Sequence, residues 1–256
     1  MVHKENGGLT VKEFFDSRAD LYQCVSRWAQ NETVNLKTDE FLEGIYGQIA
    51  IEIGAGTGIL ISRVRNFKLR IALDLSRKML AQIGDSAVLK VVGDVHQLPL
   101  SNGCADLVIC RQLLHYCDLK TAFQSIMRIL NPNGWFHVVQ VIDFDSVPES
   151  WDQEWASFRN VGNRRHQRRA ELEKCYMDSS LRVIKREYMT VRDEYPWRDF
   201  FVKNNVDHDL QKRVREFFAR TPRGIAQHID LYFDDHKIAY NRRFGFWLLQ
   251  KSEHNS

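Results

Sequence analysis

The chain has 256 residues, of which 44% are hydrophobic and 27% are charged. This is the composition of an ordinary soluble globular protein, long enough to bury a full core. The 36 Lys and Arg residues against 33 Asp and Glu residues give a formal net charge of +3. That charge is too small to argue for a nucleic-acid partner through bulk electrostatics.

The cysteines and the hydropathy of the chain bear on its compartment. The five cysteines are an odd number and form no C-x-x-C pair, which favours reduced thiols over a disulfide framework or a zinc site. No run of about 18 apolar residues is present to span a bilayer, and the first residues lack the apolar stretch of a signal peptide. We therefore expect a cytoplasmic protein with no membrane partner.

Residues 1–46 are predicted to form a helical, amphipathic cap that lies over another part of the molecule. The apolar residues of its covering face are Phe14, Phe15, Leu21, Tyr22, Val25 and Trp28.

Residues 47–147 alternate between strand and helix patterns. Short runs rich in β-branched residues predict buried strands, at 48–53, 69–74, 87–93, 105–111 and 135–142. Helices are predicted between them at 58–66, after Ser76 as N-cap, and along the apolar stripe from Ala122 to Leu130. Repeated strand–helix–strand units predict a doubly wound α/β sheet that binds ligands at the carboxyl ends of its strands.

Residues 148–242 are aromatic and basic and include a predicted strand at 181–193. The last strand is predicted at 244–252, within a terminal unit 243–256. Because no low-complexity linker separates these pieces, we expect them to pack on the same sheet. Residues 148–242 would then form a lid that keeps water from a site.

The segment IEIGAGTGIL, residues 51–60, places Gly54, Gly56 and Gly58 directly after an apolar run. A strand followed by glycines and a helix start lets the main chain approach a ligand closely, and the free N–H groups of the helix face polar atoms. A dinucleotide fingerprint would need G-x-G-x-x-G, but Ile59 stands at its last position. That disfavours a dinucleotide site and leaves other Rossmann-type nucleotide sites open.

Three motifs in order carry a resemblance to a known family. Glu52 precedes the glycines in an acid-x-G-x-G-x-G pattern, Asp74 ends the second strand, and VVGDVHQLPL (91–100) places Asp94 after the third. This set resembles the class I S-adenosylmethionine-dependent methyltransferases. Residues 111–140 further resemble small-molecule enzymes related to the ubiquinone and menaquinone C-methyltransferases. The similarity covers about residues 13–142.

The resemblance implies a Rossmann-like, seven-stranded, mostly parallel sheet with helical lid additions, and S-adenosyl-L-methionine as cofactor. The glycines would contact its methionine and ribose parts, Asp74 would accept the ribose hydroxyls and Asp94 the adenine amine. Leu75 and Val95 would sandwich the ring. The full set of implied cofactor residues is Glu52, Gly54, Ala55, Gly56, Gly58, Asp74, Leu75, Asp94, Val95, Arg111 and Tyr22.

Three members of that set have distinct expectations. Glu52 would orient the loop or, through water, the methionyl ammonium, and Tyr22 would close over the cofactor. Arg111 would repel a sulfonium unless it turns toward an acidic partner. It therefore either has a structural ion pair or meets an anionic group of the substrate.

His115 is the candidate catalytic residue. It lies in LHYCD (114–118), and its near-neutral pKa would suit removal of a proton from an acceptor. A hydrogen-bonded structural role is equally consistent with the sequence. Methyl transfer from a sulfonium mainly requires positioning of the acceptor, and the metal-ligand pattern of catechol-type enzymes is absent, so we expect no metal.

Residues 158–169, FRNVGNRRHQRR, carry five arginines. Their spacing predicts one positive helix face, which would recognise a carboxylate or phosphate of the substrate, or tRNA. The alternative is a solvated face that pairs with Glu171 and Glu173. The candidate substrate residues are Arg159, Arg164 and Trp155.

Three functions are consistent with the sequence. The favoured one is transfer of a methyl group to O, N or C of a small metabolite of aromatic or anionic character, by a monomer or homodimer. The second is a nucleic-acid or protein methyltransferase, which the sequence RQLL at 111–114 disfavours because an N-P-P-Y-type tetrapeptide is missing there. The third is a protein that binds S-adenosylmethionine without methylating.

Overall fold

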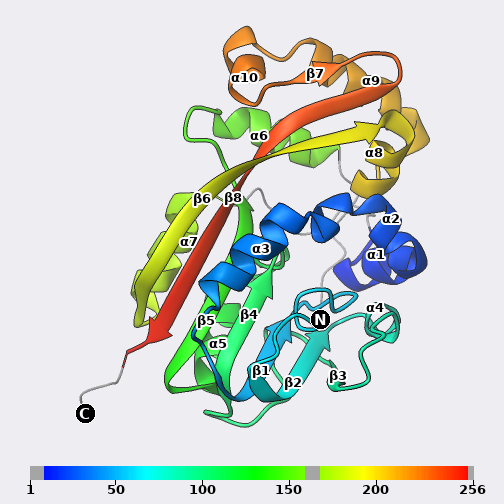
Figure 1. Ribbon diagram of the computed structural model, residues 1–256. Helices are drawn as coiled ribbons and strands as arrows, with labels where there is room; N and C mark the ends of the chain where they lie inside the picture. Colours follow the sequence, from blue (N-terminus) through cyan, green and yellow to red (C-terminus); the bar gives the residue numbers. More distant parts are fainter. Residues whose placement is uncertain (1–8, 159–167, 253–256) are drawn as a thin grey trace.

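The computed structural model describes residues 9–158 and 168–252. A single twisted sheet with helices on both sides forms its lower part, and two long strands continue from the sheet into an upper, helical part (Figure 1). In the described residues no helix has both the length and the apolar character that a membrane crossing requires.

The sheet has eight strands in the order β3-β2-β1-β4-β5-β8-β6, with β7 paired to β8. The strands are β1 (Gly47–Ile53), β2 (Phe67–Asp74), β3 (Val88–Val92), β4 (Ala105–Arg111), β5 (Leu130–Ile142), β6 (Leu181–Pro196), β7 (Tyr232–Phe233) and β8 (Lys237–Lys251). β1 to β5 pair in parallel, and β8 is antiparallel to its three neighbours. The predicted doubly wound class is confirmed, with one correction: β7, which has only two residues, is an eighth strand.

The order of the strands determines where a ligand site lies. The chain places β2 and β3 on one side of β1 and then returns to place β4 on the other side. Open α/β sheets bind ligands in the crevice at such a reversal, outside the carboxyl ends of the strands. Here those ends are Ile53 of β1 and Arg111 of β4.

The described helices form three groups along the chain. The first is α1 (Val11–Arg18), η1 (Ala19–Leu21), α2 (Tyr22–Val25), η2 (Arg27–Gln30) and α3 (Glu32–Phe41). The second is α4 (Arg77–Ala81), η3 (Leu114–Tyr116) and α5 (Leu119–Ile129). The third is α6 (Glu149–Ser157), α7 (Arg169–Asp178), α8 (Trp197–Asn204), α9 (His208–Ala219) and α10 (Arg223–His228).

Several helices begin where a polar side chain accepts a main-chain N–H that the first turn leaves unbonded. Thr10 and Glu13 form a capping box at the start of α1, Ser76 accepts from the third residue of α4, and Asp118 does the same for α5. Such N-caps contribute about 1 kcal/mol each. The predicted cap at Ser76 is confirmed.

Each face of the sheet has its own apolar core because side chains alternate across a strand. In β4, Val108 and Cys110 belong to the cluster that also contains residues of α5 and α7. Leu107 and Ile109 belong to the cluster on the other face, together with Phe41 of α3. Accordingly α3 and α5 lie on opposite sides of the sheet (Figure 1).

The predicted helix at 58–66 is wrong, because turns occupy residues 59–63. β2 begins at Phe67, so only a short segment connects the glycine loop to the sheet. The carboxylate of Glu52 also accepts the N–H of Ile61 at 2.8 Å. A side chain therefore satisfies a donor that a helix would have bonded to its own main chain.

The predicted cap, residues 1–46, is helical where the structure describes it. Phe14 is buried as expected, but Leu21 is 55% exposed, which corrects its assignment to the covering face. The side chains of Val25 and Trp28 lie outside the described part of the chain. Arg18 donates to the carbonyl oxygen of Lys203 at 2.8 Å, which joins the cap to α8.

The upper part of the molecule is held together by aromatic rings. Trp155 of α6 stacks on Phe200 of α8 and Phe217 of α9, with interplanar angles of 18° and 17°. This cluster lies beside the far ends of β6 and β8 (Figure 1). β8 begins at Lys237 and so crosses the predicted boundary between residues 242 and 243. The division of the chain into units stays an interpretation.

Candidate functional site

A cavity of about 700 Å³ opens at the carboxyl ends of β1, β2 and β4. Its walls come from the glycine loop, the ends of these strands and the N-terminal cap, including Thr10, Val11 and Phe15. Most of the predicted cofactor residues line it, namely Tyr22, Gly54, Gly56, Asp74, Leu75, Asp94, Val95 and Arg111. Glu52, Ala55 and Gly58 do not line this cavity, and their cofactor contacts stay predictions.

Gly54, Gly56 and Gly58 all have positive φ angles, but they have different structural roles. A Cβ at Gly58 would meet Ile83 at 2.8 Å, and one at Gly54 would meet Leu113 at 3.0 Å. A Cβ at Gly56 would approach only the tip of Met79 within 4 Å, at 3.3 Å, and would otherwise project into the cavity. Gly56 is therefore the position at which the main chain lies open to a ligand.

Asp74, the last residue of β2, is held in place by two main-chain donors. Its Oδ2 accepts the N–H of Gly56 and its Oδ1 the N–H of Ser76, both at 2.8 Å. Burial raises the pKa of Asp74, and these two N–H groups oppose that shift. The carboxylate is thus fixed at the wall of the cavity.

Asp94 is oriented by a histidine that sequence reasoning missed. Oδ1 of Asp94 lies 2.6 Å from Nδ1 of His96, and Nε2 of His96 accepts the N–H of Asp118 at 3.0 Å. Because Nε2 is the acceptor, the proton of the neutral ring is on Nδ1 and is donated to Asp94. The only sequence signal was the position of His96 two residues after the acid.

Glu52 lies behind the glycine loop with 2% of its surface exposed. It lines a small cavity of about 20 Å³ together with Arg111. Burial raises the pKa of Glu52 to about 7, although Arg111 and the N–H of Ile61 act in the opposite direction. The side chain therefore exchanges its proton near neutral pH.

Arg111 turns toward the N-terminal cap. Its Nη1 donates to Oδ1 of Asn35 at 2.7 Å and lies 3.5 Å from the carbonyl oxygen of Ala29. The charge of Glu52 acts on the same guanidinium. Arg111 is thus held by neutral oxygen atoms and by the charge of Glu52, and its expected role in an ion pair or toward an anionic substrate group stays a prediction.

Aromatic rings of the cap close one side of the large cavity. Phe15 packs edge-on against Tyr116 at a centroid distance of 5.5 Å and lies 6.2 Å from Tyr22. The hydroxyl of Ser76 donates to Asp16 at 2.5 Å, which connects α1 to the start of α4. The cap thus rests on the strand ends through both rings and hydrogen bonds.

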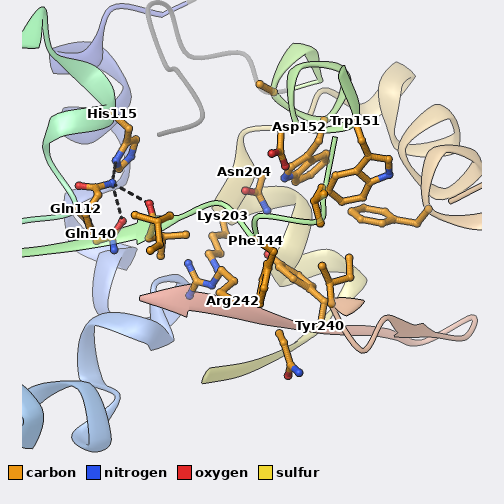
Figure 2. A pocket seen from close by; sticks show the side chains of 18 residues that line it. Gln112, His115, Gln140, Phe144, Trp151, Asp152, Lys203, Asn204, Tyr240 and Arg242 are labelled. Carbon is orange, nitrogen blue, oxygen red and sulfur yellow. Dashed lines mark hydrogen bonds between the residues drawn. The ribbon is translucent and has the colours of Figure 1, made fainter. Parts of the chain in front are cut away.

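A second cavity, of about 100 Å³, adjoins the first. Gln112 lines both. Figure 2 shows Gln112, His115 and Gln140 together at one side of it. Gln112 has a φ of 54°, which a non-glycine residue adopts at a cost, and its N–H donates to the carbonyl of Val139 at 2.9 Å. Sequence reasoning did not single out Gln112 or Gln140.

His115 faces this second cavity and is 8% exposed. Its Nδ1 lies 2.8 Å from Nε2 of Gln140. An amide that donates to Nδ1 leaves the imidazole proton on Nε2. Rotation of the Gln140 amide by a half turn would present Oε1 to Nδ1–H and free Nε2 to act as a base.

Aromatic side chains form the other side of the second cavity. They are Phe144, Trp151, Trp155, Phe218 and Tyr240. Trp155 therefore lies in the wall of the second cavity as well as in the aromatic core, and its role in substrate binding stays a prediction. Arg159 and Arg164, the other predicted substrate residues, lie outside the described residues.

The described residues contain no cluster of side chains that could bind a metal ion. Among residues 9–158 and 168–252, no three His, Cys, Asp or Glu residues are grouped as a metal ion would need. That the protein works without a metal stays a prediction.

Comparison with known families identifies the domain around the first cavity. Residues 51–138 match the model of a methyltransferase domain. The chain contains a methyltransferase domain. This domain runs from β1 into β5 and includes Asp74 and Asp94, so the resemblance predicted from the glycine motif and the two acids is confirmed.

Curated relatives of this chain include methyltransferases of different substrates. A malonyl-[acyl-carrier protein] O-methyltransferase of Herminiimonas arsenicoxydans is 29% identical over 123 residues, which cover 47% of this chain and 46% of the relative. A demethylmenaquinone methyltransferase of Corynebacterium glutamicum is 28% identical over 123 residues, covering 47% and 54%. The chain thus spans about half the length of these curated relatives.

Solved structures resemble the whole described fold. The YcgJ protein of Bacillus subtilis has a TM-score of 0.74 and 15% identity, over 87% of this chain and 100% of that one. A phosphoethanolamine N-methyltransferase 2 of Haemonchus contortus, solved with phosphomonomethylethanolamine and S-adenosylhomocysteine, has a TM-score of 0.61 and 18% identity, over 94% and 60%. At these identities the likeness establishes the fold.

Proposed function

We propose that the chain is an S-adenosyl-L-methionine-dependent methyltransferase whose acceptor is a small metabolite bound in the second cavity. The observation that carries this proposal is the junction of two cavities at Gln112. The larger is lined mostly by residues of the methyltransferase domain, and the smaller is walled by aromatic side chains outside it.

The first cavity fits the cofactor that this family uses. Its volume of about 700 Å³ lies in the usual range for ligand sites. Asp74 would accept the ribose hydroxyls, Asp94 would accept the adenine amine, and Leu75 and Val95 would hold the ring between them. The open main chain at Gly56 would receive the methionine part, and Tyr22 would cover it.

The bound cofactor would supply a methyl group on a sulfonium that leaves as a neutral thioether. The protein therefore has to orient the acceptor and exclude water. Gln112, His115 and Gln140 would hold the polar end of the acceptor at the junction. Among the described residues, Nε2 of Gln112 is buried without a hydrogen-bond partner, so it could donate to a hydroxyl or amine of the acceptor.

His115 would remove the proton that an oxygen or nitrogen acceptor loses on methylation. The half-turn of the Gln140 amide described above would give it the required tautomer. A carbon acceptor that already carries negative charge would need no such base. We place the polar end of the acceptor at the Gln112 end of the second cavity and do not assign the atom that is methylated.

The cofactor part of the proposal is tested by calorimetry with S-adenosylhomocysteine. We expect binding to the wild type, and loss of at least tenfold in affinity for Asp94→Ala, because hydrogen bonds to a charged group contribute about 1.5–3 kcal/mol each. The matched control is Asp209→Ala, whose side chain is fully exposed at the start of α9. Absence of binding by the wild type would remove the proposal.

The acceptor part is tested with methyl-labelled S-adenosylmethionine and a cell extract. We expect label in the low-molecular-weight fraction. Label in RNA or protein would favour the macromolecular alternative. Binding of S-adenosylhomocysteine without any transferred label would favour a non-methylating binding protein.

A further inference from the structure

Two cationic side chains line the second cavity and converge on one acid behind it. Lys203, near the end of α8, and Arg242 of β8 both contact Oδ2 of Asp193, which belongs to β6. The Lys203 distance is 3.3 Å, and Nζ of Lys203 also donates to the hydroxyl of Tyr195 at 2.6 Å. Lys203 and Arg242 line the cavity, whereas Asp193 does not.

Arg242 keeps an N–H group for a ligand. Its Nε is buried and has no hydrogen-bond partner among the described residues. Burial acts to lower the pKa of Arg242, but the charge of Asp193 outweighs it and the pKa is raised. The guanidinium is therefore charged at all physiological pH values. A buried N–H without a partner costs about 1–3 kcal/mol, a cost that an acceptor atom of a ligand would remove.

The surroundings of the two cations favour a ligand that combines an anion with an apolar body. In the view of Figure 2, Lys203 and Arg242 lie between the Gln112 end of the cavity and the rings of Trp151 and Tyr240. The carboxylate of Asp152 also lines the cavity, but it already interacts with other residues. Guanidinium and ammonium donors side by side are a typical site for a carboxylate or phosphate.

We propose that Lys203 and Arg242 form a subsite for an anionic group of the acceptor, a carboxylate or a phosphate, next to the aromatic wall of the second cavity. This inference rests on the proposed function and adds the chemical class of the acceptor. A purely structural role would need only one cation to neutralise Asp193. The second cation and the Nε–H group of Arg242 are therefore available to bind the anionic group of the ligand.

The inference is tested on protein saturated with S-adenosylhomocysteine, with benzoate, phenyl phosphate and benzamide as probes. Trp151 and Trp155 line the cavity, so binding changes the intrinsic tryptophan fluorescence. We expect benzoate or phenyl phosphate to bind at least tenfold more tightly than the neutral benzamide, as a charge-assisted hydrogen bond predicts. Tighter binding of benzoate would identify a carboxylate site, and tighter binding of phenyl phosphate would identify a phosphate site. If neither anion binds more tightly than benzamide, the inference is wrong.

Variants separate the subsite from the fold. Lys203→Met leaves Asp193 paired with Arg242, and we expect it to weaken the anionic probe about tenfold while the benzamide signal is unchanged. The matched control is Lys237→Met, which removes an ion pair with Glu194 on exposed surface and should not alter probe binding. Equal anion affinity in Lys203→Met and wild type would overturn the inference.

A second variant should change the affinity for the anionic probe in the opposite direction. Asp193→Asn leaves both cations without their carboxylate, so a folded variant should bind the anionic probe more tightly than the wild type. Because unpaired buried charges destabilise a fold, its melting temperature should also rise more than that of the wild type when the probe is added. If S-adenosylhomocysteine binds to all variants while the anion shows no preference, this inference fails and the proposed function stands.

Discussion

The main-chain N–H of Gly56 donates to Oδ2 of Asp74 at 2.8 Å. This bond joins the loop after β1 to the end of β2, across the parallel pair that the two strands form. The residue that lets the main chain approach a ligand therefore also fixes the carboxylate that would bind the same ligand. Loop conformation and carboxylate position are coupled.

Replacing Asp74 by Ala should remove both effects. We expect the affinity for S-adenosylhomocysteine to fall by at least tenfold, because the carboxylate acceptors are lost and the loop loses a charge-assisted hydrogen bond of about 1.5–3 kcal/mol. Calorimetry measures the affinity, and circular dichroism checks the fold. An affinity equal to that of Asp209→Ala would show that Asp74 does not contact the cofactor.

Alanine at Gly58 and at Gly56 should have different consequences. Both have positive φ, which costs an L-residue about 1–2 kcal/mol, but only the Cβ at Gly58 would also meet Ile83 at 2.8 Å. We expect Gly58→Ala to lower the melting temperature more, and Gly56→Ala to lower S-adenosylhomocysteine affinity more. If the two variants lost melting temperature and S-adenosylhomocysteine affinity to the same extent, the two glycines would not have separate roles.

The stability of the protein should depend on the ionisation of Glu52. Its pKa of about 7 lies above the ordinary value of 4.5, so the folded state keeps a proton that the unfolded chain releases. The stability contribution is complete below pH 4.5 and is lost as the pH rises toward 7. We expect the free energy of unfolding to fall by up to roughly 3 kcal/mol over this range relative to Glu52→Gln. Urea unfolding at several pH values measures it.

The control for this pH dependence is Glu43→Gln at an exposed position after α3. Its stability profile should run parallel to that of the wild type. A Glu52→Gln profile that is also parallel would mean that Glu52 ionises normally in the folded protein.

His115→Phe should separate binding from methyl transfer. Because His115 lines the second cavity and not the first, we expect the affinity for S-adenosylhomocysteine to be unchanged. Label transfer to the small-molecule fraction should fall by about 10²-fold or more if His115 is a general base. Gln140→Leu should give a smaller loss through the orientation of the ring. Full transfer by His115→Phe would leave His115 a structural residue.

The first cavity was largely predictable from local sequence. Gly54, Gly56, Asp74 and Asp94 each follow a recognisable strand, and parallel strands bring their carboxyl ends to one edge of a sheet. Order along the chain was therefore sufficient to place these residues together. The glycine pattern did not reveal that Gly58 packs against Ile83, since that contact depends on where α4 lies.

The second cavity was mostly not predictable. Asp193, Lys203 and Arg242 belong to β6, α8 and β8, and none follows a motif. They meet because β6 and β8 pair along their whole length, with Val191 opposite Arg242 and Asp193 opposite Tyr240. The most basic segment of the sequence, residues 158–169, led us to predict Arg159 and Arg164 as substrate residues. Both lie outside the described residues.

The sequence by itself determined the alternation of strands and helices and the positions of the two acids at strand ends, because these depend on periodicity and turn chemistry within short segments. Only the tertiary structure decided that residues 59–63 turn instead of forming a helix, that His96 holds Asp94, and which cations face an acceptor. These features depend on contacts between segments far apart in the chain. No local pattern specifies such contacts, because the free energy that selects them arises from burial and pairing in the assembled fold.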